Sequence, residues 1–209
     1  LKLRLGDGNG FGAESSFDLK LSSFPTALTS KPPKGSQRRC SIDAVSNEAL
    51  IFSFEKRSKN NPDETWKVQS YDLFSESNKQ AAWAMDDFDG NGWSDLVVSD
   101  SSLGELLFLP GKPHGQFGSA REIPSLRGVS ELHPIRVGKK LRPSLLILSR
   151  DEEALGLANF DKKGLFSFPE MIPTKGSPLL AVSTDCDSDG VEEILVVTEN
   201  DSDFSLVTW

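Results

Sequence analysis

An internal repeat of about 49 residues constrains the fold of this chain more than any other feature of its sequence. Two independent markers keep this spacing. Phe117 and Phe166 are 49 positions apart, and Asp87 and Asp185 are 98 apart, which is twice 49. Four short apolar runs also recur along the chain, at 50–54, 96–98, 145–148 and 194–197. Repeats of this length are typical of arrays in which each unit buries its apolar faces against its neighbours.

Each repeat contains several short segments in which apolar and polar residues alternate, as they do in β-strands. Examples are "ELLFLP", "EALGLANF" and "DFSLVTW", and clusters of Gly, Asn, Asp and Pro separate such segments. No stretch carries an apolar stripe of helical period over several turns. The chain is therefore predicted to be all-β. A unit of about 40 to 50 residues with about four strands is typical of a β-propeller blade.

The composition excludes some partners. The chain has 31 Asp and Glu against 23 Lys and Arg, a formal net charge of -8, which disfavours a general binder of nucleic acid or anionic membrane. Its apolar runs are far shorter than the roughly 18 residues that span a bilayer, so no membrane insertion is expected in this segment. The cysteines, Cys40 and Cys186, form no C-x-x-C pair. Two free, buried thiols are expected, with a disulfide or a reactive thiol as alternatives.

Two nine-residue loops, 87–95 ("DFDGNGWSD") and 185–193 ("DCDSDGVEE"), have the pattern expected of calcium sites. Calcium takes six to eight oxygen ligands at about 2.3–2.6 Å. Alternate side chains of a tight loop, at positions 1, 3, 5 and 9, point toward one centre, and position 7 supplies its backbone carbonyl. The predicted ligands of two Ca²⁺ ions are Asp87, Asp89, Asn91, the Trp93 carbonyl and Asp95, and Asp185, Asp187, Asp189, the Val191 carbonyl and Glu193.

These loops differ from an EF-hand, which needs a Glu at position 12 on an exiting helix. Position 12 is Val98 in one loop and Val196 in the other, and both belong to runs typical of strands. Position 6 is Gly92 or Gly190, where a sharp turn with positive φ is expected. Carboxylates this close repel one another unless a cation lies between them. A solvated acidic turn is the alternative, but two such loops in phase with the repeat favour metal.

The tetrapeptide "DGNG" occurs twice, and its two copies have different predicted roles. At 89–92 it lies between Asp87 and Asp95, so its Asp and Asn are predicted ligands. At 7–10 no acid stands two residues before Asp7. This copy is predicted to be a hairpin turn in which Asn and Gly supply positive φ.

The two intervening repeats lack the acidic loop. Arg136 falls at position 1 in one of them, with Lys139, Lys140 and Arg142 nearby. No calcium is expected there, and the basic groups either occupy the same space or form an exposed basic loop. In the first repeat, "SIDAVSNEA" keeps Asp43 but little else, and no site is predicted.

The segments "DFDGNGWSDLVVSD" with "GQFGSAREI", "DCDSDGVEEILVVTE" and "GDGNGFGAESSF" resemble the FG-GAP/VCBS repeat family, the calcium-binding propeller repeats of integrin α subunits and many bacterial surface proteins. The resemblance implies a β-propeller, usually of seven blades, with calcium in hairpin loops at one rim. It also implies an extracellular, cell-surface or periplasmic location. Two repeats without an acidic loop, and roughly four repeats in place of seven, depart from the family pattern.

Residues 1–209 are therefore expected to form one segment of a larger propeller rather than a closed four-bladed ring. The Pro-, Ser- and Lys-rich stretch 24–39 is predicted to be a loop between blades. The predicted units are the end of a preceding blade at 1–21, a degenerate blade at about 22–72, a calcium blade at about 73–125, a degenerate blade at about 126–174, and a truncated calcium blade at about 175–209.

The expected function is that of a non-catalytic adhesion or interaction module stabilised by calcium. Its partner is predicted to be a protein or a glycan, and another chain or a missing segment is expected to complete the propeller. A carbohydrate-binding propeller is the second hypothesis, because Trp66, Tyr71, Trp83 and Trp93 have rings that stack on sugars, although core packing is their ordinary role.

A propeller domain of a polysaccharide-degrading enzyme is the third hypothesis. The chain has two histidines, His114 in a turn and His133 before a proline, and a structural role is the simpler reading of each. No G-x-S-x-G, H-E-x-x-H or Gly-rich phosphate loop occurs. A pair of catalytic carboxylates needs no local motif, so the hypothesis stays open.

Overall fold

The computed structural model describes residues 2–6, 11–16, 25–31, 37–44, 48–55 and 66–72, and then 82–100, 103–113, 116–138, 142–201 and 203–209. Within these ranges seventeen strands form five antiparallel sheets. None of the described residues belongs to a helix long and apolar enough to cross a membrane. The predicted all-β fold is thus confirmed.

The sheets are named here in chain order. The N-terminal hairpin pairs β1 (Lys2–Gly6) with β2 (Phe11–Ser16), and sheet A contains β3 (Pro25–Lys31), β4 (Gln37–Ala44), β5 (Glu48–Glu55) and β6 (Trp66–Asp72). Sheet B contains β7 (Trp83–Asp86), β8 (Asp95–Asp100), β9 (Glu105–Leu109) and β10 (Arg121–Pro124). Sheet C contains β11 (Val129–Ile135), β12 (Ser144–Ser149), β13 (Ala154–Ala158) and β14 (Glu170–Ile172), and sheet D contains β15 (Ser177–Thr184), β16 (Glu193–Asn200) and β17 (Asp203–Thr208).

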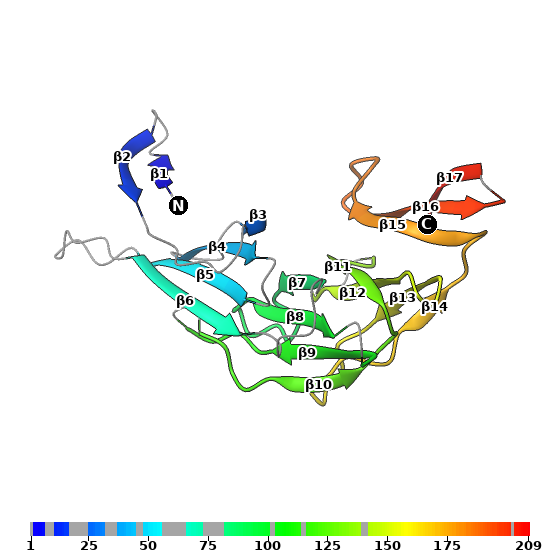
Figure 1. Ribbon diagram of the computed structural model, residues 1–209, viewed down its shortest axis with the longest axis horizontal. Helices are drawn as coiled ribbons and strands as arrows, with labels where there is room; N and C mark the ends of the chain where they lie inside the picture. Colours follow the sequence, from blue (N-terminus) through cyan, green and yellow to red (C-terminus); the bar gives the residue numbers. More distant parts are fainter. Residues whose placement is uncertain are drawn as a thin grey trace.

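Figure 1 shows the sheets following one another along an open arc, with the two chain termini at its ends. Within each sheet the strands are neighbours in the order in which they occur in the chain. The first strands of successive sheets meet, because β11 contacts both β7 and β15. The fourth strands β10 and β14 lie toward the convex side (Figure 1). The described residues form an arc and not a closed ring.

Sheets B, C and D keep the 49-residue repeat. Their second strands begin at residues 95, 144 and 193, and their third strands at 105, 154 and 203. The same interval separates two isolated bridges that follow the third strands, Gly111↔Phe117 and Phe160↔Phe166. The N-terminal hairpin has the related pairing Gly6↔Phe11, and its predicted turn at 7–10 lies outside the described residues.

The first unit contradicts two predictions. The stretch 24–39 is not one loop between blades, because it contains β3 and the start of β4, which pair antiparallel. Pro25 stands at the first position of β3, where a strand tolerates a residue without an N–H. Strand pairing therefore overrides the loop-like composition of this stretch.

The apolar run 50–54 is also out of phase with the three later runs. It lies in β5, the third strand of sheet A, whereas the later runs lie in the second strands β8, β12 and β16. Asp43, which was compared with position 1 of the acidic loops, lies within β4. Strands β4 and β8 begin at residues 37 and 95, 58 apart, so this unit is nine residues longer than the others.

Sheets B, C and D pack face to face through apolar side chains. Between sheets B and C, four aromatic rings meet at centroid distances of 5.0 to 5.8 Å, mostly edge to face. Phe88 comes from the loop after β7, Phe108 from β9, and Phe160 and Phe166 from the two ends of the hairpin after β13. This arrangement joins the loop of one sheet to the outer hairpin of the next.

Sheet D leaves one apolar face uncovered. Phe204 and Leu206 in β17 are 67% and 68% exposed, and the cross-strand register places Leu180 on the same face. The residues 49 positions earlier, Leu155 and Leu157 in sheet C, pack against sheet D. The uncovered face is thus the repeat equivalent of the face through which sheet C contacts its successor.

The aromatic contact between sheets B and C predicts a large difference between two phenylalanines of one hairpin. Phe166 is 5% exposed and Phe168 is 61% exposed. Phe166→Ala should lower the free energy of unfolding by about 3–5 kcal/mol, because it removes a buried ring and leaves a cavity. Phe168→Ala should change it by less than about 0.5 kcal/mol. Urea unfolding measures the free energy of unfolding of both variants. Equal decreases in the two variants would contradict the described packing of Phe166.

Candidate metal centres

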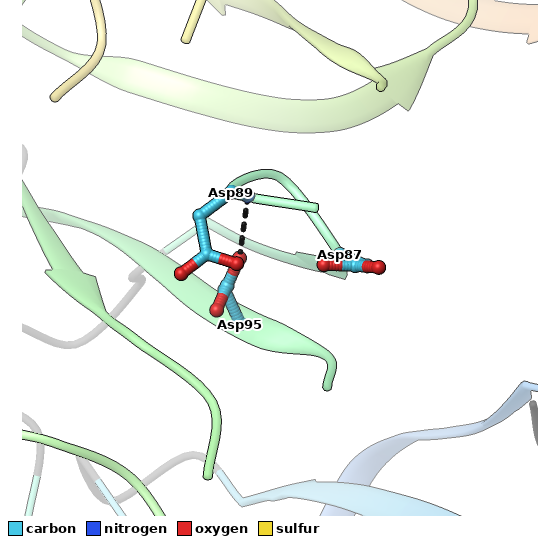
Figure 2. Close-up of side chains that lie close together, drawn as sticks. All are labelled: Asp87, Asp89 and Asp95. Carbon is cyan, nitrogen blue, oxygen red and sulfur yellow. Dashed lines mark hydrogen bonds between the residues drawn. The ribbon is translucent and has the colours of Figure 1, made fainter. Parts of the chain in front are cut away.

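Each acidic loop connects the first strand of a sheet to the second. Residues 87–95 follow β7 in sheet B, and residues 185–193 follow β15 in sheet D. Each loop brings three carboxylates together, with one oxygen from each lying within 4.8 Å of the others. These clusters are Asp87, Asp89 and Asp95, drawn in Figure 2, and Asp185, Asp187 and Glu193. Both clusters could hold a metal ion.

Three hydrogen bonds define the backbone of the first loop. The Gly92 N–H donates to Asp87 Oδ2 at 3.0 Å, and the Phe88 N–H donates to Asp95 Oδ2 at 2.8 Å. The Trp93 N–H donates to Asn91 Oδ1 at 2.7 Å. The side chains at positions 1, 5 and 9 therefore hold the loop backbone, and those at positions 1 and 9 also belong to the carboxylate cluster.

The second loop repeats this pattern 98 residues later. The Gly190 N–H donates to Asp185 Oδ2 at 3.0 Å, and the Cys186 N–H donates to Glu193 Oε2 at 2.8 Å. The Val191 N–H donates to Asp189 Oδ1 at 2.8 Å. The predicted positive φ at position 6 is present in both loops, at 90° in the first and 88° in the second.

Asp95 is the most buried of the six carboxylates. It has no exposed surface, and it also accepts hydrogen bonds from the N–H groups of Gly111 at 2.6 Å and Asp89 at 3.2 Å. Burial raises the pKa of Asp95 to about 6, and the nearby Asp89 carboxylate also raises it, although these hydrogen bonds act in the opposite direction. Figure 2 shows the Asp89 and Asp95 carboxylates side by side. A bound cation would stabilise this pair in its ionised form.

Gly111 supports the first loop from the hairpin after β9, a role that sequence reasoning missed. A Cβ at this position would overlap the Ser94 carbonyl, so only glycine allows the hairpin backbone to approach the loop this closely. This approach brings the Gly111 N–H to Asp95. The equivalent residue in sheet C is Phe160, which packs in the aromatic cluster instead. The sequence signal was the glycine that opens "GKPHGQFG" after an apolar strand.

The second loop is more open than the first. Asp185 and Asp187 are exposed, whereas Asp87 and Asp89 are half-buried. Position 2 differs in the same way, because Phe88 is buried in the core whereas its equivalent, Cys186, is exposed. The predicted burial of the Cys186 thiol is therefore wrong, and this thiol is free. The side chain of Cys40, in β4, lies outside the described residues.

Not every predicted ligand joins a cluster. The exposed Asp189 carboxylate is not among the clustered groups, and its Oδ1 accepts the Val191 N–H. The Asn91 amide donates to Asp89 Oδ2 at 2.8 Å, so a metal would need its oxygen to turn inward. The ligand roles of the Trp93 and Val191 carbonyls stay predictions.

The loop between β11 and β12, residues 136–143, is the basic counterpart of the acidic loops. Arg136 Nη2 donates to the Asp86 carboxylate at 3.2 and 3.3 Å, and the Arg136 N–H donates to Glu192 Oε2 at 2.8 Å. Lys139 and Lys140 lie outside the described residues. The basic loop therefore contacts residues that adjoin both acidic loops.

The other residues singled out from the sequence have ordinary contacts where they are described. His133 is half-buried, and its Nε2 lies 3.3 Å from Glu131 Oε2. Trp83 packs on a small core cluster within sheet B. His114 and the side chains of Trp66 and Tyr71 lie outside the described residues.

Comparison with known proteins identifies no relative. No known family matches the chain, and no curated protein matches it. The resemblance to FG-GAP/VCBS repeats therefore stays a prediction that rests on the sequence motifs.

The close approach at Gly111 predicts that Gly111→Ala disturbs the first loop. The added methyl group should displace the Ser94 backbone and break the bond to Asp95, lowering the free energy of unfolding by roughly 2–4 kcal/mol. Ser119→Ala, an exposed change in the same hairpin, should change it by less than about 0.5 kcal/mol. Urea unfolding in the presence of a chelator measures the effect on the loop itself. A neutral Gly111→Ala would show that the hairpin does not hold Asp95.

Proposed function

We propose that this protein is a non-catalytic, calcium-stabilised segment of a β-propeller that acts as an adhesion or interaction module. One observation carries the proposal. Two loops 98 residues apart have the same three backbone hydrogen bonds and each gathers three carboxylates. Because the two loops occupy equivalent positions in the repeat and have the same structure, we infer that they have the same function.

The donor chemistry favours calcium among the common metals. The clusters offer carboxylate oxygens, without a histidine or thiolate ligand, which suits hard cations. Magnesium demands a near-ideal octahedron, whereas calcium accepts irregular sets of six to eight oxygens. Side-chain oxygens at position 5 and the carbonyl at position 7 would extend each set of three. The ion would hold together carboxylates that otherwise repel one another.

Several features support the propeller architecture. Antiparallel sheets of three or four strands follow one another along an arc (Figure 1). The first strands of sheets B, C and D are in contact, and the fourth strands of sheets B and C lie toward the outside. The uncovered face of sheet D is equivalent to a face that is covered in sheet C. A further sheet of the same kind, from another chain or segment, would cover it and continue the arc.

A location outside the cytoplasm fits this role. Calcium sites in extracellular modules commonly have dissociation constants of about 10⁻⁴–10⁻³ M, which match the calcium level outside cells. Open loops with exposed ligands, such as Asp185 and Asp187, suit weak binding of this kind. The metal then acts by stabilising sheet packing and not by chemistry.

Thermal melts test the metal assignment. At about a hundredfold excess over Kd, each occupied site should stabilise the fold by about 2.7 kcal/mol relative to chelator. The double variant Asp89→Ala plus Asp187→Ala should lose most of this calcium-induced rise in Tm. Glu122→Ala plus Glu170→Ala is the matched control, since it removes two exposed acids from β10 and β14 and should keep the rise. Wild-type protein with no rise in calcium would sink the assignment.

The pKa of Asp95 predicts how the calcium effect depends on pH. A carboxyl with a folded pKa of about 6 stabilises the fold below its ordinary value of about 4 and loses this contribution as pH rises through 6. The protein in chelator should therefore lose stability over this window, while calcium binds better as the proton leaves. Melts at about pH 5 and pH 7.5 should give the larger calcium-induced rise in Tm at the higher pH. An equal rise at both values would exclude Asp95 as a ligand.

A further inference from the structure

Arg136 occupies the repeat position that an aspartate occupies in each acidic loop. Asp87, Arg136 and Asp185 are separated by intervals of 49 residues, and each follows the first strand of its sheet. Sheet C thus places a fixed positive charge on the rim where sheets B and D place clustered negative charges.

The contacts of Arg136 reach both neighbouring sheets. Its Nη2 lies 3.2 Å from Asp86 Oδ2, and Asp86 Oδ1 also accepts the Asp87 N–H at 2.8 Å. On the other side, the Arg136 N–H donates to Glu192 Oε2 at 2.8 Å, and Nη1 lies 3.9 Å from Glu192 Oε1. Asp86 immediately precedes the first acidic loop, and Glu192 precedes the last residue of the second.

A second arginine places the basic loop directly over the first acidic loop. A Cβ on Gly90 would come within 2.5 Å of Arg142 Nε, and the positive φ of Gly90, 75°, also requires glycine there. Arg142 is the repeat equivalent of Trp93 and Val191, the predicted carbonyl ligands at position 7. Two positions that would serve a metal in the acidic loops are thus cationic in sheet C.

We infer that Arg136 is a built-in cation that joins the two acidic loops and stabilises them when their metals are absent. The inference rests on the proposed calcium binding and deepens it. Without metal, the guanidinium pairs with Asp86 and Glu192, each of which is next in sequence to a clustered carboxylate, and so it reduces the negative charge around both loops. With metal bound, the ion neutralises the clustered carboxylates next to Asp86 and Glu192 and repels the nearby guanidinium, so Arg136 contributes less. Linkage then requires that Arg136 lowers the affinity of the loops for calcium.

Replacing Arg136 should therefore lower the stability of the metal-free protein and raise its affinity for calcium. Arg136→Gln should bind calcium about two- to fivefold more tightly than wild type, the range expected for half-exposed charge pairs. Arg136→Lys keeps the charge and should retain the wild-type affinity. Arg150→Gln is the matched control, because it removes an exposed arginine at the far end of β12, and it should leave the affinity unchanged.

Two measurements separate this inference from the proposed function. Calorimetric titration with calcium should show the tighter binding of Arg136→Gln, and an unchanged or weaker affinity would overturn the inference. Urea unfolding in chelator should show a stability gap between wild type and Arg136→Gln that shrinks as NaCl screens the charges. A wild-type protein that binds no calcium would refute the proposed function instead. In that case, a gap that does not shrink with salt would overturn the cationic role of Arg136 as well.

Discussion

Face-to-face packing of consecutive sheets is the interaction on which the rest of this structure depends. A small antiparallel sheet cannot bury both of its apolar faces alone, so each sheet gains stability from its neighbours in the array. Leu146, Leu148 and Leu155 of sheet C are buried in one cluster with Ala181 and Val196 of sheet D. Sheets B to D repeat every 49 residues. Their packing therefore places the loops between first and second strands along the same rim.

The packing reaches the candidate metal centre through Phe88. Its ring lies 5.0 Å from that of Phe166 in the next sheet, while its N–H donates to Asp95. The first loop is therefore anchored by the same residue that joins sheets B and C. The second loop has the exposed Cys186 at this position, which provides no anchor of this kind. We expect it to gain more order from a bound metal than the first loop does.

The sequence predicted features for which a particular residue type or spacing is required. It did not predict features that depend on which residues the fold brings into contact. The 49-residue spacing predicted the repeated strands of sheets B to D, and the glycine at position 6 of each acidic loop predicted a positive φ there. Composition misplaced β3 and β4, since strand pairing decided their conformation. The support of Asp95 depends on a hydrogen bond from the Gly111 N–H to its side chain, across 16 residues of sequence. Residue type also does not encode the exposure of Cys186, whose repeat equivalent in sheet B is the buried Phe88.

The alternation of acidic and basic loops along the rim has an electrostatic reason. If all three loops were acidic, their carboxylates would repel one another from sheet to sheet whenever metal was scarce, and this repulsion would oppose the packing of the sheets. Arg136, in the middle loop of the three, contacts Asp86 and Glu192 and so reduces this repulsion. Under the proposed function, metal binding would be confined to the two acidic loops on either side of this basic loop. If the acidic loops bind calcium as proposed, the repeat without an acidic loop would help the array to stay folded when calcium is scarce.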